Sequence, residues 1–408
     1  MANRVCFVFV KLAVVSAFVV TMVVAGCGGE SGSGGSGSTD AGGSVPGGGA
    51  DGGTAPVAGD AGDGGGFQIW ISVASSADGT KLVAVSNGNI NYNNINNLGY
   101  IYTSADYGVT WKQTGPQTNW TSVASSADGT KLVAAAIAYT VDGREVSSDD
   151  PLVGGGLYTS SDSGATWTLT GSSPNLLSPD WSQGSWYSVA SSTDGTKLVA
   201  WGIERICTSV DSGATWTPAA LPFVLTVSGS VASSADGAKL IAVSGGGAGT
   251  PGPIYTSADS GATWTPRTLS TQLGALQWWT SVASSADGTK LVATAAAGAA
   301  GVYYPITTAG NYTSADSGAT WAWRGYDKNQ WLSVASSADG TKLVAGAGVG
   351  YIYTSSDYGA TWTQTTAPVA TWLSVASSAD GTKLVAAADA GYIYTSSDSG
   401  ATWTQRGW

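Results

Sequence analysis

The sequence contains no histidine. Without an imidazole there is no histidine general base, no histidine metal ligand and no Ser-His or Cys-His nucleophile pair. Cysteine is almost as scarce, with only three residues, at positions 6, 27 and 207. Cys207 is alone after the N-terminal region, so no disulfide can form there. It replaces a tyrosine of the repeat described below, and we expect a buried, small hydrophobic side chain.

Charge is also scarce, because only 11% of the 408 residues are charged and the formal net charge is −11. A nucleic-acid partner would require a basic face, and none is evident. The same acidity argues against binding to anionic lipid head groups and is typical of a soluble surface. Helix-forming residues are few, whereas Gly, Ser, Thr, Val, Trp and Tyr are abundant. This bias favours strands and turns.

The N-terminus carries Arg4 and Lys11 and then an apolar run that ends in Val-Ala-Gly-Cys at Cys27. The run is short for a membrane span and typical of a signal peptide. Its end resembles the lipobox of bacterial lipoproteins, which implies a signal peptide over 1–26 and lipidation of Cys27. An uncleaved membrane anchor is the alternative. Residues 27–66 then form a Gly/Ser/Asp-rich linker. We therefore expect an exported protein, held at the outer membrane or cell surface by its lipid alone.

Residues 67–408 contain one sequence unit that is repeated seven times. Each unit reads as four short strands, with Ala-Asp-Gly-Thr as the turn between strands one and two. A second turn, Asp-Ser-Gly-Ala-Thr, lies between strands three and four. Its aspartates are Asp106, Asp162, Asp211, Asp259, Asp316, Asp357 and Asp398. The shortest spacing between them, 41 residues, suits one four-stranded blade.

The second turn, Ser-x-Asp-x-Gly-x-Thr-Trp, resembles the Asp-box or BNR repeat. That family includes sialidases, xyloglucanase-type glycosidases, sortilin-like receptors and photosystem II assembly factors. The resemblance implies an all-β, seven-bladed β-propeller over 67–408. It also implies that the box aspartate accepts backbone N–H bonds, the glycine takes a strained dihedral, and the tryptophan packs beneath as core. Because the repeats are in phase with whole blades, no spare strand is available to close the ring.

One face of this propeller is expected to be nearly the same in every blade, and the other to differ from blade to blade. The turns between strands one and two and between three and four barely vary. Insertions fall in the loops between strands two and three (86–99, 137–156, 245–252, 295–310) and in the crossings between blades (170–185, 219–228, 268–278). Fourteen aspartates are explained as turn residues. The other eight carboxylates of the domain lie in the variable classes: Asp142, Glu145, Asp149, Asp150, Asp180, Glu204, Asp327 and Asp389. Because variable loops on a rigid scaffold usually carry binding residues, we predict the site there.

The predicted ligand-binding residues on that face are Trp181, Trp278, Arg144, Arg205, Asp327 and Asp389. Trp181 and Trp278 can stack on sugars or on peptide aromatics, or simply pack within their loops. Six further tryptophans precede strand one, and we expect them to pack between blades or to ring the channel mouth: Trp70, Trp120, Trp186, Trp279, Trp331 and Trp372. The fourth unit lacks this residue. Trp201, Trp323 and Trp408 are off-pattern.

The first functional hypothesis is a non-catalytic binding or scaffold module for a protein or carbohydrate, monomeric and without a cofactor. The second is a glycoside hydrolase, sialidase-like or another exo-glycosidase, which requires two carboxylates about 5 to 10 Å apart. The candidate catalytic residues are Glu145, Glu204, Asp149, Asp150 and Asp180. The pairs to test are Glu145 with Glu204, and Asp149 or Asp150 with Asp180. The arginine cluster and Arg-Ile-Pro motif of a sialidase-like site are not found.

A third hypothesis, a photosystem-assembly-like factor, rests on a resemblance at the level of single blades. Such a resemblance predicts a fold and not a role. Calcium binding at Asp149-Asp150 is a weaker possibility than a solvated acidic loop, so we predict no metal site.

Overall fold

The computed structural model describes residues 68–87, 98–140, 152–170, 184–203, 205–219, 229–245, 252–267, 278–296, 310–324, 330–389 and 391–407. These residues belong to one compact unit, Gly66–Trp408. The described part is all-β and contains no α-helix. Accordingly, it offers no helix long and apolar enough to cross a membrane.

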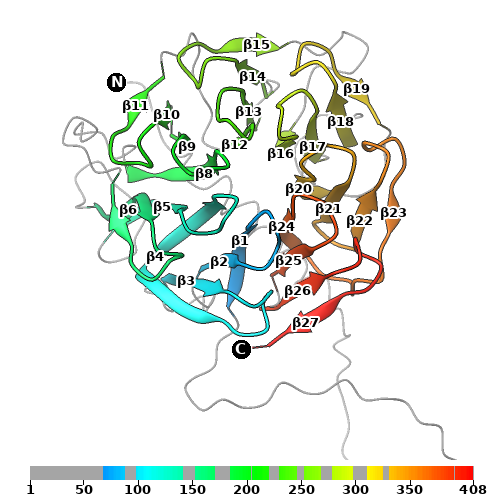
Figure 1. The fold of residues 1–408 in the computed structure, drawn as a ribbon, viewed down its shortest axis with the longest axis horizontal. Helices are drawn as coiled ribbons and strands as arrows, with labels where there is room; N and C mark the ends of the chain where they lie inside the picture. Colours follow the sequence, from blue (N-terminus) through cyan, green and yellow to red (C-terminus); the bar gives the residue numbers. More distant parts are fainter. Residues whose placement is uncertain are drawn as a thin grey trace, which may run out of the picture. The chain divides into compact units, whose positions relative to one another are not determined.

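The strands follow the repeats in chain order (Figure 1). They are β1 (Ile69–Ser75), β2 (Leu82–Asn87), β3 (Gly99–Ser104), β4 (Lys112–Ser125), β5 (Leu132–Thr140), β6 (Leu152–Ser160), β7 (Thr168–Leu169), β8 (Trp186–Ser191), β9 (Leu198–Gly202), β10 (Arg205–Ser209), β11 (Thr217–Pro218), β12 (Gly229–Ser233), β13 (Leu240–Ser244), β14 (Ile254–Ser257), β15 (Thr265–Arg267), β16 (Trp278–Ser284), β17 (Leu291–Ala296), β18 (Gly310–Ser314), β19 (Ala322–Trp323), β20 (Trp331–Ser336), β21 (Leu343–Ala347), β22 (Ile352–Ser355), β23 (Thr363–Gln364), β24 (Trp372–Ser377), β25 (Leu384–Ala388), β26 (Ile393–Ser396) and β27 (Thr404–Arg406).

The strands form antiparallel sheets arranged around a centre (Figure 1). Five sheets have four strands each, and one sheet, β1–β7, has seven. In that larger sheet the first half of β4 pairs with β3 and the second half with β5. Two four-stranded halves therefore share β4, and the crossing between the first two repeats is continuous strand rather than loop. The innermost strands contact one another in a closed cycle, β1, β4, β8, β12, β16, β20, β24 and back to β1.

Backbone hydrogen bonds close this cycle without a strand exchanged between the first and last repeats. The N–H of Ala77, in the turn after β1, donates to the carbonyl oxygen of Ala127 in the next repeat at 2.7 Å. The same bond recurs around the ring and ends with the Ala379 N–H donating to the Ala77 oxygen at 2.7 Å. Serine hydroxyls of the innermost strands add a second set, in which the Val73 N–H donates to Ser374 Oγ across the junction.

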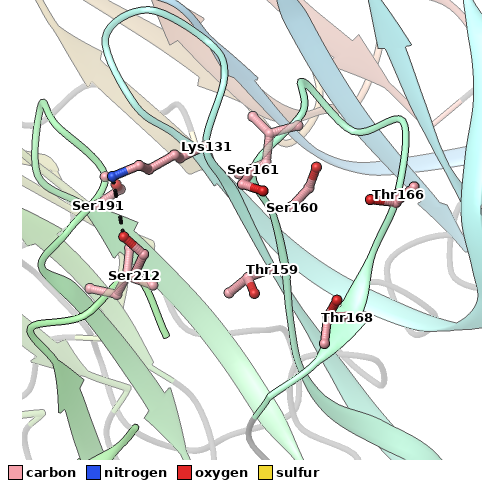
Figure 2. Close-up of a pocket in the computed structure, with 11 residues that line it drawn as sticks. Lys131, Thr159, Ser160, Ser161, Thr166, Thr168, Ser191 and Ser212 are labelled. Carbon is pink, nitrogen blue, oxygen red and sulfur yellow. Dashed lines mark hydrogen bonds between the residues drawn. The ribbon is translucent and has the colours of Figure 1, made fainter. Parts of the chain in front are cut away.

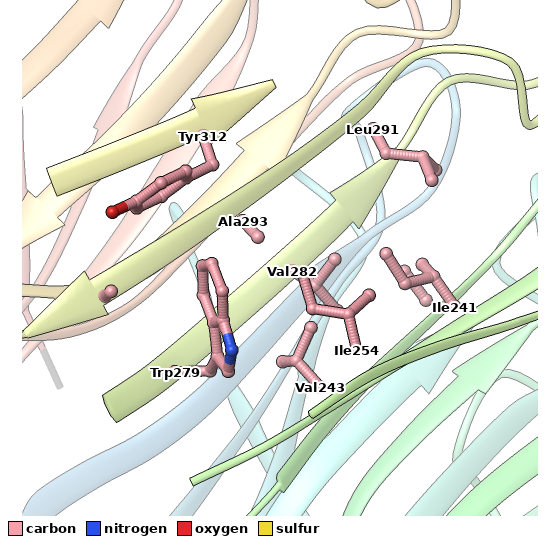
Figure 3. Close-up of a cluster of buried hydrophobic side chains, with 10 residues drawn as sticks. Ile241, Val243, Ile254, Trp279, Val282, Leu291, Ala293 and Tyr312 are labelled. Carbon is pink, nitrogen blue, oxygen red and sulfur yellow. The ribbon is translucent and has the colours of Figure 1, made fainter. Parts of the chain in front are cut away.

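The core lies between sheets as well as within them. In the cluster of Figure 3, Ile241, Val243 and Ile254 of the β12–β15 sheet pack against Trp279, Val282 and Tyr312 of the β16–β19 sheet. Trp279 meets Tyr312 edge-on, with ring centroids 5.1 Å apart. The six tryptophans expected before strand one are all at most 2% exposed. They pack between sheets, as predicted. Each belongs to the first strand of its repeat, whose pairing continues across a β-bulge between the tryptophan and the serine two residues later.

Trp201 compensates for the tryptophan that the fourth unit lacks. Trp201 is paired with Ser188, and in the first repeat the same position, paired with Ser72, is held by Val85. Val85 packs against Trp120, the tryptophan of the following repeat. Trp201 is fully buried, and a Cβ added to Gly229 would lie 2.3 Å from its ring. The large side chain therefore comes from the preceding sheet, and Gly229 leaves room for it.

Other expectations need correction. The predicted loop 137–156 is partly a hairpin, because β5 continues to Thr140 and pairs there with Leu152. The box tryptophans were expected in the core, but apart from Trp264, at 6% exposure, they are only half-buried at the margins of the clusters. A box tryptophan must cover its own turn, and this holds it near the surface. Cys207 is fully buried, as predicted, and burial raises the pKa of its thiol to about 11.

Candidate functional site

Most of the predicted site residues lie outside the described part of the chain. They are Asp142, Arg144, Glu145, Asp149, Asp150, Asp180, Trp181, Glu204, Asp327 and the lipidation candidate Cys27. Their distances from one another, and hence the carboxylate pairs proposed for a glycosidase, stay predictions. Within the described residues, no group of three or more Cys, Asp or Glu is placed to hold a metal ion.

Three predicted binding residues are described, and they lie on three different sheets. Arg205 begins β10 opposite Gly202, and Trp278 begins β16 opposite Ala296. Asp389 follows β25, and its N–H donates to the Thr371 oxygen at 3.0 Å. All three are half-buried. No two of their sheets are neighbours in the ring, so the structure does not bring these three side chains together.

The opposite face is built from the two repeated turns, and we call it the turn face. In the turn after β1, the Ser76 hydroxyl and the Thr80 N–H donate to Asp78 Oδ1 at 2.6 and 2.9 Å. Gly79 has φ +73°, which a glycine adopts at low cost. The N–H of Tyr107, in the Asp-box of the same repeat, donates to the Thr80 oxygen at 2.8 Å. The same bond recurs in every repeat, so both turns lie on one face, as predicted.

The Asp-box aspartate accepts hydrogen bonds within its turn, as the resemblance to the Asp-box family implies. Asp106 accepts the Thr110 N–H at 2.8 Å and the Thr110 hydroxyl at 2.6 Å. The glycine has positive φ, and so does the residue before it, at about the same value in all seven boxes. That preceding residue is Tyr107, Ser163, Ser212, Ser260, Ser317, Tyr358 or Ser399.

These hydrogen bonds engage the carboxylates of the turn face within their own turns. Donation from Thr110 lowers the pKa of Asp106 to about 2, and donation from Ser76 and Thr80 does the same for Asp78. The pKa is lowered in all fourteen turn aspartates. Carboxylates held ionised in this way are poor proton donors at neutral pH and serve as turn anchors.

Clefts open on the turn face where one repeat meets the next, and each is named here for the box residue that enters it. In the Ser163 cleft, the Lys81 ammonium donates to the Asp128 oxygen at 2.9 Å and approaches Ser163 Oγ at 3.5 Å. The stem of Lys81 lies on the turn glycine of the next repeat, where a Cβ on Gly129 would come within 2.7 Å. At every junction between repeats the stem of a lysine lies in the same way on the turn glycine of the next repeat.

The Ser163 and Ser212 clefts are hollow. The Ser163 cleft has a volume of about 320 Å³ and is lined by Leu82, Thr103, Ser104, Trp111, Lys112 and Leu132, among others. The Ser212 cleft has a volume of about 100 Å³, and Figure 2 shows Lys131, Thr159, Ser160 and Ser212 around it. Lys131 Nζ donates to Ser212 Oγ at 3.3 Å there. The linings combine hydroxyls, an ammonium and leucine side chains.

In two other clefts a tyrosine occupies the corresponding space. The Tyr358 hydroxyl donates to the backbone oxygens of Leu291, at 3.1 Å, and of Ser314. The Tyr107 hydroxyl likewise donates to Leu384, at 3.3 Å, and to Ser396, across the junction that closes the ring. Burial raises the pKa of both phenols to about 12. Lys290 and Lys383 lie 5.7 and 5.8 Å from the two ring centroids.

Sequence reasoning missed these clefts, because each is formed by residues of two repeats that lie far apart in the chain. The signal was nevertheless visible. The position after the box aspartate is tyrosine at 107 and 358 and serine in the other five boxes. It is one of the few variable positions in an otherwise constant turn.

Comparison with known proteins agrees with this architecture. Residues 352–365, which include one complete box, match the BNR-Asp box repeat. YCF48 from Cyanidioschyzon merolae is similar in structure, with a TM-score of 0.54 and 16% identity over 82% of this chain and 96% of that chain. An ancestral GH74 enzyme is similar with a TM-score of 0.57 and 16% identity, over 84% of this chain and 46% of that one. No curated protein matches the sequence. The chain is therefore a β-propeller built from Asp-box repeats, and at this identity the likeness shows the fold alone.

Proposed function

We propose that this protein is a non-catalytic binding scaffold for a protein or carbohydrate ligand, exported and anchored to the cell envelope by lipid on Cys27. The hollow Ser163 cleft is the observation that carries the proposal. Its lining of ammonium, hydroxyl and aliphatic groups suits recognition. The carboxylates beside the clefts are held ionised in turns, which does not suit acid catalysis.

The scaffold is proposed to have seven blades. The closed cycle of innermost strands supports this count, with β4 contributing its second half as the innermost strand of one blade. The hydrogen-bonded belt of one alanine or threonine per repeat supports it as well. A rigid ring of this kind holds loops and clefts in fixed positions, which is what a binding scaffold requires.

A binding and hydrolysis screen with the full chain tests the functional proposal. Immobilised glycans and envelope proteins serve as ligands, and model glycosides report turnover. We expect saturable binding and no turnover. Turnover that disappears in Glu145→Gln or Glu204→Gln would replace the scaffold with the glycosidase alternative. Loss of binding in Trp278→Ala or Arg205→Ala, with binding retained in Ser163→Tyr, would place the ligand on the variable face.

The anchor is tested separately by labelling cells with a palmitate analogue. We expect the label on the wild-type chain and not on Cys27→Ala, with Cys207→Ala as the matched control that keeps it. Equal labelling of wild type and Cys27→Ala would refute the lipid anchor and leave the binding role untouched.

A further inference from the structure

The hollow clefts and the tyrosine-filled clefts lie at equivalent positions of the repeat. The Tyr358 hydroxyl bonds the carbonyl oxygens of Leu291 and Ser314, the first residue of strand two and the last of strand three. The residues at those two places in the first repeat are Leu82 and Ser104, and both line the Ser163 cleft. Leu132 and Ser160 hold the same places in the Ser212 cleft.

The lysine beside the ring is also present in both. Lys290 lies over the Tyr358 ring, and Lys81, its counterpart in the first repeat, lines the Ser163 cleft. A lysine ammonium over an aromatic face is attractive, and this attraction grows where water is excluded. The backbone does not distinguish the two cases either, because Ser163 has φ +58° and Tyr358 has φ +59°. Serine in place of tyrosine therefore removes the occupant and leaves the leucine, the lysine and the two carbonyl oxygens. Arg324, which also lies over the Tyr358 ring, has Thr114 as its counterpart beside the Ser163 cleft.

From this equivalence we infer that the Ser163 cleft is a binding slot for a tyrosine side chain presented by a protein partner. The inference rests on the proposed scaffold role and names the chemistry of its ligand. The slot supplies a leucine-lined wall for the ring, the Lys81 ammonium over its face, and the carbonyl oxygens of Leu82 and Ser104 for the hydroxyl. Its volume of about 320 Å³ exceeds the roughly 150 Å³ of cavities that accept benzene.

The Ser212 cleft has the same groups in less space, about 100 Å³, and is expected to bind the same ring more weakly. The Ser317 cleft differs in another way. Arg267 Nε donates to Thr256 Oγ1 at 2.7 Å, as Arg324 and Arg406 do to their threonines beside the two tyrosines. The Ser317 cleft therefore has the arginine of a filled cleft without the tyrosine.

The test uses 4-methylphenol, which is the tyrosine side chain as a free molecule, titrated into the isotope-labelled full chain and followed by NMR. We expect saturable shifts at residues around the Ser163 cleft. Toluene, which lacks the hydroxyl, should bind about fivefold more weakly, because one net hydrogen bond is lost. A pentapeptide with a central tyrosine should compete, and the same peptide with alanine should not.

Variants decide whether the slot is the site. Ser163→Tyr places the protein's own ring in the cleft and should abolish these shifts, whereas the matched control Ser163→Ala leaves the cleft open and should keep them. Tyr358→Ser should create a new site at Leu291 and Ser314, an independent readout if Ser163→Tyr fails to fold. Unchanged binding of 4-methylphenol in a folded Ser163→Tyr chain would overturn the inference.

The same variants separate this inference from the proposed function. If 4-methylphenol and the tyrosine pentapeptide bind the slot while no protein is captured by the full chain, the scaffold role for proteins fails and only the tyrosine-binding chemistry of the slot stands. If a protein is captured equally by wild type and Ser163→Tyr, the slot inference fails and the scaffold role stands.

Discussion

The tyrosine-filled clefts and the serine clefts have the same backbone turn and differ at the residue that follows the box aspartate. Both filled clefts also carry an arginine over the ring, Arg324 or Arg406. At Tyr358 the ring joins two sheets through its hydroxyl and through two cations above its faces. At Ser163 the same space is a cavity of about 320 Å³. A repeat protein can thus tune the junction between neighbouring units at one position while keeping every turn intact.

The placement of the two tyrosines adds to this comparison. Tyr107 lies at the junction between the last and first repeats, where no covalent connection links the two sheets. The Tyr358 junction is also crossed by the chain itself. A tyrosine at the closing junction therefore supplies contacts where the chain itself makes no connection, and Trp70 and Val385 pack together at the same junction.

Acid should produce the largest effect, because it acts on the turns that all clefts share. The pKa of the turn aspartates is lowered, to about 2 at Asp106 and Asp128, against about 3.9 in an unfolded chain. Their contribution to stability is therefore complete above about pH 5 and is lost progressively as the pH falls towards 2. The urea midpoint should be flat from pH 7 to 5 and should decline steeply below pH 4. A midpoint that is unchanged at pH 2.5 would contradict this role for the turns.

Tyr107→Ser should have the next largest effect, a loss of about 2 kcal/mol in the free energy of unfolding, since a half-buried ring and its hydrogen bonds disappear. Urea denaturation provides the measurement. Serine is the matched replacement, because five boxes already carry it at the same φ. Tyr358→Ser should cost less, since the chain still links the two sheets there. Equal losses would mean that the closing junction has no special dependence on its tyrosine.

Ser163→Tyr should act in the opposite direction and stabilise the fold by about 1 kcal/mol, because it fills an existing cavity. Thermal unfolding measures the change, with Ser163→Ala as the variant that fills nothing. A destabilised Ser163→Tyr would show that the Ser163 cleft is not equivalent to the Tyr358 cleft.

Alkali should give the smallest effect. Burial raises the pKa of Tyr107 and Tyr358 to about 12, so the neutral phenols stabilise the fold below pH 10 and lose this contribution as the pH rises through 12. The double variant Tyr107→Phe, Tyr358→Phe should show a shallower decline of the urea midpoint between pH 9 and 11. Part of the decline should persist, because Tyr187 and Tyr255 have similarly raised pKa values. The same decline in both proteins would place the alkaline sensitivity elsewhere.

The fold was largely predictable from the sequence because each repeat encodes its own strands and turns. Ala-Asp-Gly-Thr and the Asp-box are local signals, and residues such as Asp106 and Gly79 do in the structure what those patterns require. The Trp201 substitution was also within reach, since one repeat gains a tryptophan next to the repeat that lacks one. The clefts were not predictable, because they depend on how Lys81 of one repeat meets Ser163 of the next. The predicted catalytic carboxylates belong to loops outside the described residues.

The continuous belt of backbone bonds has a consequence for how this gene can be rearranged. Because the bond from Ala379 to Ala77 is the same as every other bond in the belt, the belt does not distinguish the junction between the last and first repeats from the others. A circular permutant opened between β11 and β12, with the former ends joined by a short loop, would therefore regenerate the same ring. It would also turn the Tyr107 junction into an ordinary internal one.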